Sequence, residues 1–240
     1  MIKTALEFIV GLKKPDITEH NGHEYTDKPL TLVTLPKAEP LLVCTLSAVN
    51  GFIDTLNRKG QEPGREIMIH IVSPAQIHVV SRELLSDMHR EKLLVSSIIE
   101  HKFSFGDPMS QEAFIVGVQT HFVQTEATAR LLKFVGNIKG SSVGILADDG
   151  VTQTVETKNG LSLGKNAEVS NPWTLAPFRT FTEIEQPESK YFLRLTKRGD
   201  GIPSIALHEV VDNQWQLVAI GNIRKWLLEH EPANLNPIIG

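Results

Sequence analysis

The sequence has almost no cysteine: Cys44 is the single one among 240 residues. One cysteine excludes an intramolecular disulfide, and a chain of this size without disulfides is typical of a reducing compartment. Cys44 lies in the apolar run PLLVCTLSAV, so we expect a buried small side chain rather than a nucleophile. We therefore expect the protein in the cytoplasm.

The chain also lacks a dominant charge and a long apolar run. Its formal net charge is −4 and its pI is about 6.1, which gives no general attraction to nucleic acid. No apolar stretch approaches the roughly 20 residues that span a bilayer. The first residues, MIKTALEFIVGLKKP, lack the long apolar core and the small-residue cleavage site of a signal peptide. We expect no association with a membrane.

The sequence motifs of common enzymes are missing as well. The chain has no GxxxxGK[ST], no GxGxxG after a strand and no GxSxG. Its nine histidines are scattered, without a cysteine pair or an HExxH motif beside them. We therefore predict a protein that is not an enzyme, with no catalytic residue, no cofactor and no bound metal.

Two short stretches nevertheless hold the side chains of a metal site. His20 and His23 frame Asn21-Gly22, but zinc sites normally need three or four ligands, and Asn-Gly is a strong hairpin turn signal. Asp148 and Asp149-Gly150 offer carboxylates to Mg²⁺, yet these residue types also make tight turns between strands. In both stretches we favour the turn.

Two further histidines stand in EIMIHIVSPAQIHVVSREL, which predicts a hairpin around a loop at 73–76. Pairing Val72 with Ile77 would place His70 and His78 on opposite faces of the sheet, so we do not expect them to bind one metal together. Apolar residues populate both faces, which predicts a sheet covered on both sides for part of its length.

The pattern predicts a mixed α+β first half, residues 1–140, that contains a helix pair. Apolar spacing favours helices in TALEFIVGL, from Thr45 to a stop at Gly60, and in two segments capped by Asp107 or Ser110 and by Thr125. LTLVTLP predicts a strand. His121 stands near a predicted helix end, where the dipole favours a basic residue.

The second half, residues 141–230, predicts an antiparallel β meander followed by a C-terminal helix. Asp149-Gly150 and Asn159-Gly160 mark turns between alternating strands. PSIALHEVVDNQWQLVAI predicts a hairpin that places His208 opposite Leu217, and NIRKWLLEH predicts the helix. The tail, residues 231–240, has two prolines and predicts an extended arm. The alternative is one integrated domain that contains both halves.

The stretch TLAPFRTFTEIEQPES raises the question of whether Arg179 recognises a ligand. A turn at 186–189 would make it the first strand of a hairpin, with Phe181 facing Arg194 and Glu183 facing Phe192. Two phenylalanines on one charged face are unusual in open solvent. We therefore predict a subunit interface, formed by Arg179, Phe181, Phe192 and Arg194.

Four segments resemble the YfdQ-like family of uncharacterised phage and prophage proteins. They are EAFIVGVQTHFVQTEATARLLKFVGNIKG, DDGVTQTVETKNG, NPWTLAPFRTFTEIEQPESKYFLRL and WQLVAIGNIRKWL, and the resemblance covers most of residues 65–230. It implies a gene of a tailed phage or prophage that is expressed in bacterial cytoplasm. It supplies no catalytic residues to carry over.

Two functions fit these observations. The first is a non-enzymatic protein that assembles with itself, favoured by the apolar first helix, the apolar strands and the extended tail. The second is an accessory protein of phage DNA metabolism that binds DNA or a DNA-processing partner. Local basic residues favour the second function: Arg194, Lys197, Arg198, Arg224 and Lys225.

Overall fold

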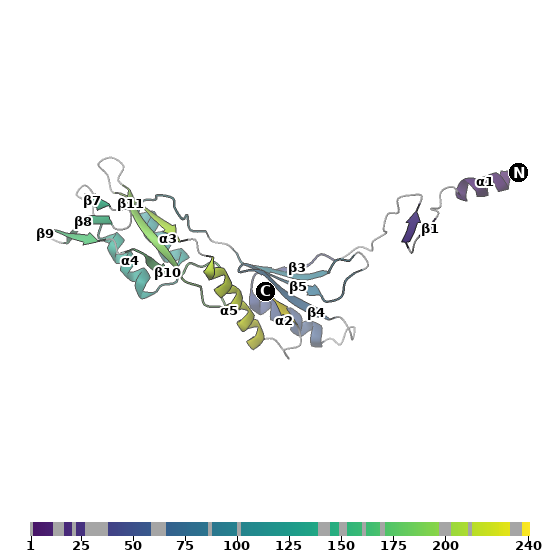
Figure 1. The fold of residues 1–240 in the computed structure, drawn as a ribbon. Helices are drawn as coiled ribbons and strands as arrows, with labels where there is room; N and C mark the ends of the chain where they lie inside the picture. Colours follow the sequence, from purple (N-terminus) through teal and green to yellow (C-terminus); the bar gives the residue numbers. More distant parts are fainter. Residues whose placement is uncertain are drawn as a thin grey trace. The chain divides into compact units, whose positions relative to one another are not determined.

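The computed structural model divides the chain into two compact units, Met1–Ala38 and Glu39–Gly240 (Figure 1). The structure describes the following residues: 2–11, 17–20, 23–26, 38–58, 66–85, 88–99, 102–138, 145–148, 153–159, 162–168, 171–196, 203–210, 213–230 and 237–240.

The first unit holds helix α1 (Ile2–Gly11) and the strands β1 (Ile17–His20) and β2 (His23–Thr26). The two strands pair antiparallel, and His20 lies opposite His23 in the register. The predicted helix and the hairpin around Asn21-Gly22 are thereby confirmed. The strand predicted in LTLVTLP lies outside the described residues.

A five-stranded sheet with the order β13-β4-β5-β6-β3 organises one part of the second unit. Its strands β4, β5 and β6 form an antiparallel meander, and β3 and β13 add to its two edges as parallel strands. The strands are β3 (Leu41–Val43), β4 (Ile67–Ser73), β5 (Gln76–Ser81), β6 (Lys92–Ser97) and β13 (Ile238–Ile239). The tail is extended at β13, as predicted, but it pairs with β4 of its own chain.

Helices α2 (Leu46–Arg58) and α5 (Gln214–His230) pack on one face of this sheet. Their buried side chains and the inward side chains of the strands form a cluster, here called the sheet core, together with Phe181 and Ile184. The helix predicted from Thr45 is confirmed, and Leu46, Val49 and Ile53 of its apolar stripe are completely buried, whereas Leu56, at the far end of the stripe, is 37% exposed.

A second cluster, here called the helix-pair core, lies between a pair of helices and a three-stranded antiparallel sheet. It joins buried residues of α3 (Gln111–His121) and α4 (Glu126–Gly136) to those of β10 (Trp173–Leu175), β11 (Ser189–Thr196) and β12 (Ser204–Glu209). Ser110 and Thr125 cap the helices, as predicted. Both cores contain residues from before and after position 140. The division of the chain into two halves at this position stays a prediction.

Three further strands follow α4: β7 (Ile145–Asp148), β8 (Gln153–Asn159) and β9 (Ser162–Glu168). They pair antiparallel in chain order, which confirms the predicted meander between the two Gly-containing turns. The fold is therefore α+β, with a helix pair, antiparallel strands and a C-terminal helix.

The hairpin predicted across 204–220 is wrong, because α5 begins at Gln214 and includes its expected second strand. Ala219, Ile223 and Leu227 are spaced by four residues and are all buried, whereas Leu217 is 73% exposed. The apparent alternation around Trp215 was thus the first turn of a helical stripe. His208 consequently lies opposite Phe192 of β11 and not opposite Leu217.

The predicted register of the β4–β5 hairpin is also wrong. Ser73 pairs with Gln76 across a two-residue turn, and Ile71 pairs with Ile77, so Val72 is an extra residue on β4. This bulge shifts the pairing by one residue. His70 and His78 therefore lie directly opposite each other on the same face, with ring centroids 6.3 Å apart.

Cys44 differs from the prediction as well, because its side chain is exposed. It occupies the connection between β3 and α2, where the apolar run PLLVCTLSAV leaves the sheet. Val43 in this run is half-buried against the sheet core, and Leu46 is the first residue of the run that is completely buried.

The two leucines Leu227 and Leu217 test the orientation of α5. We expect Leu227→Ala to lower the free energy of unfolding by about 2–5 kcal/mol, because it opens a cavity in the sheet core. Leu217→Ala should change it by no more than about 0.5 kcal/mol, since that side chain is exposed. Urea denaturation measures both, and equal losses would contradict the helical orientation.

Candidate functional site

Residues 176–188, here called the joining loop, connect β10 to β11 and contain the stretch around Arg179. The hairpin predicted here is wrong: Leu175 pairs with Ser189, and the residues between them form no strand. The side-chain amide of Gln186 accepts hydrogen bonds from the backbone N–H groups of Arg179 and Thr180, and it donates one to the carbonyl of Phe181 at 2.9 Å. One glutamine thus satisfies the backbone groups that a strand would have paired.

The four residues of the predicted interface do not share a face. Phe181 is 1% exposed and belongs to the sheet core. Phe192 and Arg194 lie on β11 opposite His208 and Ala206, and both are half-buried. Arg179 lies in a polar cluster at the end of β12. An interface through these residues stays a prediction, but the shared face on which it rested is not present.

The joining loop contacts both cores. At its start, the N–H of Phe178 donates to the carbonyl of His121 at the end of α3. Further along, the Thr180 hydroxyl donates to the carbonyl of Pro74 in the β4–β5 turn at 2.6 Å. Glu183 Oε1 then accepts from the backbone N–H of Ser47 in the first turn of α2 at 3.1 Å. A carboxylate at that helix end satisfies a free N–H group and suits the dipole.

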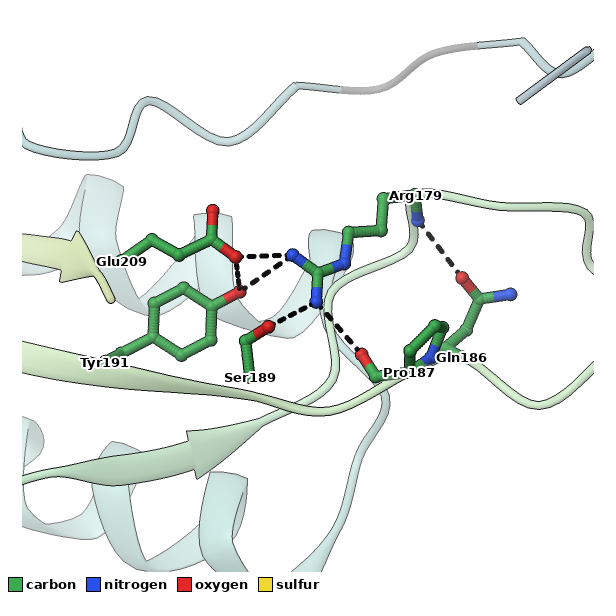
Figure 2. Close-up of polar contacts among 6 residues, drawn as sticks. All are labelled: Arg179, Gln186, Pro187, Ser189, Tyr191 and Glu209. Carbon is green, nitrogen blue, oxygen red and sulfur yellow. Dashed lines mark hydrogen bonds and ion pairs between the residues drawn. The ribbon is translucent and has the colours of Figure 1, made fainter. Parts of the chain in front are cut away.

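Arg179 holds the loop to the end of β12 (Figure 2). Its Nη1 donates to Glu209 Oε1 at 2.5 Å and to the Tyr191 hydroxyl at 3.5 Å. Its Nη2 donates to Ser189 Oγ at 2.5 Å and to the carbonyl of Pro187 at 3.3 Å. The side chains of the ion pair are only 14% and 23% exposed. Both terminal nitrogens are therefore engaged within the protein.

An aromatic side chain covers the same guanidinium. The carbon Cζ of Arg179 lies 3.8 Å from the ring centroid of Trp215, in the first turn of α5, which is a cation–π contact. On the other side of the pair, the Tyr191 hydroxyl donates to Glu209 Oε1 at 3.2 Å. Burial, opposed by the charge of Arg179, raises the pKa of Tyr191 well above its ordinary range. The phenol therefore remains a proton donor in this cluster.

A cavity of about 310 Å³ lies next to this cluster. Its walls are mostly apolar and include four aromatic side chains, Phe103, Phe105, Phe178 and Trp215. Its polar lining consists of Lys102, His121, Arg179 and Glu209. A hollow of about 470 Å³ on the Glu185–Lys190 side of Trp215 is larger, but its lining is rich in charged and amide side chains. The apolar cavity has the composition of a ligand site.

The histidines do not combine into a reactive group. Among the described residues, no three His, Cys, Asp or Glu side chains gather where they could hold a metal ion. Burial, with Lys92 and His70 nearby, lowers the pKa of His78. His121 stands in the last turn of α3, as predicted, and lines the cavity. The cavity therefore offers chemistry for binding, and its lining includes no nucleophilic side chain activated by a base.

Sequence reasoning found Arg179 but missed its partners Glu209, Tyr191 and Trp215. The wrong hairpin placed Trp215 on a strand, and Glu209 had no pattern of its own. The one available signal was the charge balance: a lone arginine between phenylalanines needs a carboxylate partner if it is buried.

Comparisons of the chain with protein-family models, with curated proteins and with solved structures find no match. The resemblance to the YfdQ-like family stays a prediction. None of the described helices is long and apolar enough to cross a membrane.

The ion pair of Arg179 with Glu209 should carry much more stability than an exposed pair. We expect Arg179→Ala to lower the free energy of unfolding by about 2–4 kcal/mol, because Glu209 is left without its cation in a largely buried place. The exposed pair Lys225–Glu229 on α5 is the control. Lys225→Ala should cost less than about 0.5 kcal/mol. Similar losses in both variants, measured by urea denaturation, would contradict this reading.

The raised pKa of Tyr191 predicts a loss of stability at high pH. On titration upward, a tyrosine in the unfolded chain loses its proton near the ordinary value of 10.0, while folded Tyr191 keeps its proton. The free energy of unfolding should therefore fall above about pH 10, by up to about 1.4 kcal/mol per pH unit, and be unaffected by this group below it. Tyr191→Phe should remove this part of the slope. Identical slopes in both proteins, measured by denaturation between pH 8 and 11, would disprove it.

Proposed function

We propose that the protein assembles with itself into a homo-oligomer through the uncovered face of the five-stranded sheet. The observation that carries this proposal is a row of paired residues that crosses all five strands on that face. In the order of the strands, the row consists of Ile239, His70, His78, Val95 and Leu42. It is here called the open row.

The open row contrasts with the row next to it, which faces the sheet core. The adjacent residues Ile69, Val79 and Leu94 are at most 1% exposed, because α2 and α5 cover them. At the ends of the two rows, Ile239 is 50% exposed against 9% for Ile238, and Leu42 is 78% exposed against 56% for Leu41. Large aliphatic side chains with this exposure at both ends of one row favour a protein partner.

The composition of the open row favours a second copy of the chain as that partner. Its two ends are aliphatic and its centre is a histidine pair. In a twofold contact, the aliphatic ends of one copy would pack on those of the other, and the histidine pairs would meet at the centre. None of its five residues is a lysine, an arginine or an acid, which disfavours phosphate groups and strongly charged partners. Val79 and Val80 point to opposite faces of β5 and both are buried, which fits the predicted cover on both sides for part of the sheet. The ends of the open row are exposed, and assembly would cover them.

Helix α1 supports assembly independently. Its ten residues are too few for a stable isolated helix in water. Ile2 and Leu6 are nevertheless 80% and 56% exposed. Packing against another subunit would bury these side chains and stabilise the helix.

The role that we propose for the assembly is non-enzymatic. The resemblance to phage and prophage proteins is our reason to propose that it acts in the cytoplasm of a bacterial host during phage or prophage expression. The alternative, an accessory protein of DNA metabolism, has less support: Arg224 and Lys225 are exposed on α5, Arg194 is half-buried, and Lys197 and Arg198 lie outside the described residues.

Leu42 provides the test of the proposed function. The wild-type chain should be larger than its 26.6 kDa protomer in multi-angle light scattering at micromolar concentration. Leu42→Asp should shift it toward the protomer, because the charge would be buried in the contact. Leu217→Asp, at an equally exposed leucine of α5 on the covered side of the sheet, should leave the particle size unchanged. A monomeric wild type, or equal effects of both variants, would overturn the proposal.

A further inference from the structure

The apolar cavity beside Arg179 plays no part in the proposed self-assembly. Its apolar walls suit a ligand, and its polar groups determine which charge that ligand can carry. The cavity measures about 310 Å³, close to the lower limit for small-molecule sites and large enough for one or two fused rings. Phe178 is 43% exposed and stands at its wall. Flat aromatic walls favour a flat ligand, because rings gain most by stacking or by edge-to-face contact.

An anionic ligand is disfavoured, although Arg179 lines the cavity. The Nη1 and Nη2 groups of this arginine already donate to Glu209, Tyr191, Ser189 and the carbonyl of Pro187. Its remaining donor is Nε, and a bidentate contact to a carboxylate or phosphate needs two. Binding an anion would also place it beside the Glu209 carboxylate.

A permanently cationic ligand is disfavoured too. Such a ligand gains from aromatic rings and from a carboxylate. Here the Arg179 guanidinium already holds that place, because its Cζ lies 3.8 Å from the ring centroid of Trp215 and its Nη1 donates to Glu209. A second cation would lie beside the first, so a neutral ligand remains.

The cavity offers hydrogen-bond acceptors to such a ligand. The hydrogen bonds of Arg179 and Tyr191 to Glu209 both end at Oε1, so Oε2 accepts from neither of them. His121 Nδ1 lies 2.9 Å from the carbonyl of Gly117 and 2.8 Å from Oγ1 of Thr120, whose hydroxyl donates to the carbonyl of Val116. These contacts fit the tautomer with its hydrogen on Nδ1, in which Nε2 is the acceptor. A ligand that fits between aromatic walls and pairs with these two acceptors is a flat ring that carries N–H donors.

We propose that this cavity binds a small, neutral, planar heteroaromatic ring with N–H donors, such as an amino-substituted nucleobase. The aromatic walls hold the ring, and Glu209 Oε2 and His121 Nε2 accept hydrogen bonds from its edge. This site is independent of the uncovered sheet face, so it does not require the proposed assembly.

Calorimetric titration of the full chain with adenine tests the proposal. For a ligand of this size we expect a Kd roughly between 0.1 and 1 mM. 9-Methylpurine keeps the two rings but has no N–H, and it should bind at least about tenfold more weakly, because the acceptors are left unpaired. Benzoate and trimethylphenylammonium represent the anionic and cationic classes. Binding of either one as tightly as adenine would overturn the proposal, as would no adenine binding up to about 5 mM.

Two variants locate the binding in this cavity. Trp215→Leu should weaken adenine binding at least about tenfold, whereas Trp226→Leu, on the same helix but outside the cavity, should change it less than about twofold. Phe178→Leu provides a second measurement that is independent of the Arg179 contact, with an expected loss of about threefold. Wild-type affinity in both Trp215→Leu and Phe178→Leu would refute the site.

A short oligodeoxyadenylate distinguishes the source of the ring. Binding that is tighter than that of adenine and weakens with salt would identify the ring as a base within a nucleic acid strand. Equal or weaker binding would identify a free base or nucleoside. In either case the loss in Trp215→Leu should be the same if the ring occupies this cavity.

Discussion

The contact between Arg179 and Glu209 is the interaction on which the arrangement of the second unit depends. The arginine is the point where the joining loop is tied to β12, and Trp215 presses the first turn of α5 onto the same guanidinium. A cation that is desolvated to this degree needs its carboxylate, because alone it would cost far more than the loop could compensate. The pair therefore fixes the loop, and the loop in turn brings Phe181 and Ile184 into the sheet core.

The same arrangement explains why the loop can be irregular and still well determined. Gln186 satisfies its backbone from within, Thr180 bonds to the β4–β5 turn, and Glu183 bonds to the start of α2. The contacts of Thr180 and Glu183 join residues that are far apart in the sequence. The contact of Gln186 is local, but it uses a side chain in place of the backbone hydrogen bonds of a strand pair. The joining loop thus connects the two cores through polar contacts. The spacing of apolar residues in the sequence does not predict such contacts.

Local signals therefore predicted much of the fold and little of the site. The caps Ser110 and Thr125 and the stripe of α2 follow from neighbouring residues, and the structure confirms them. The start of α5 and the bulge at Val72 were missed, because short apolar runs fit both periods and a bulge leaves no mark in the pattern. The partners of Arg179 come from β11, β12 and α5, and no local rule connects positions so far apart.

The two edges of the five-stranded sheet have a consequence for how the sheet folds. Strand β3 belongs to residues 41–43, and β13, which pairs with β4, belongs to residues 238–239. At the end of β13, a Cβ added to Gly240 would lie 2.6 Å from Cβ of Ile71, so the backbone fits closely there. Because β4 and β13 are far apart in the sequence, their pairing has a high contact order. Completion of the sheet is therefore slow, and the edge of β4 stays unpaired until β13 joins it.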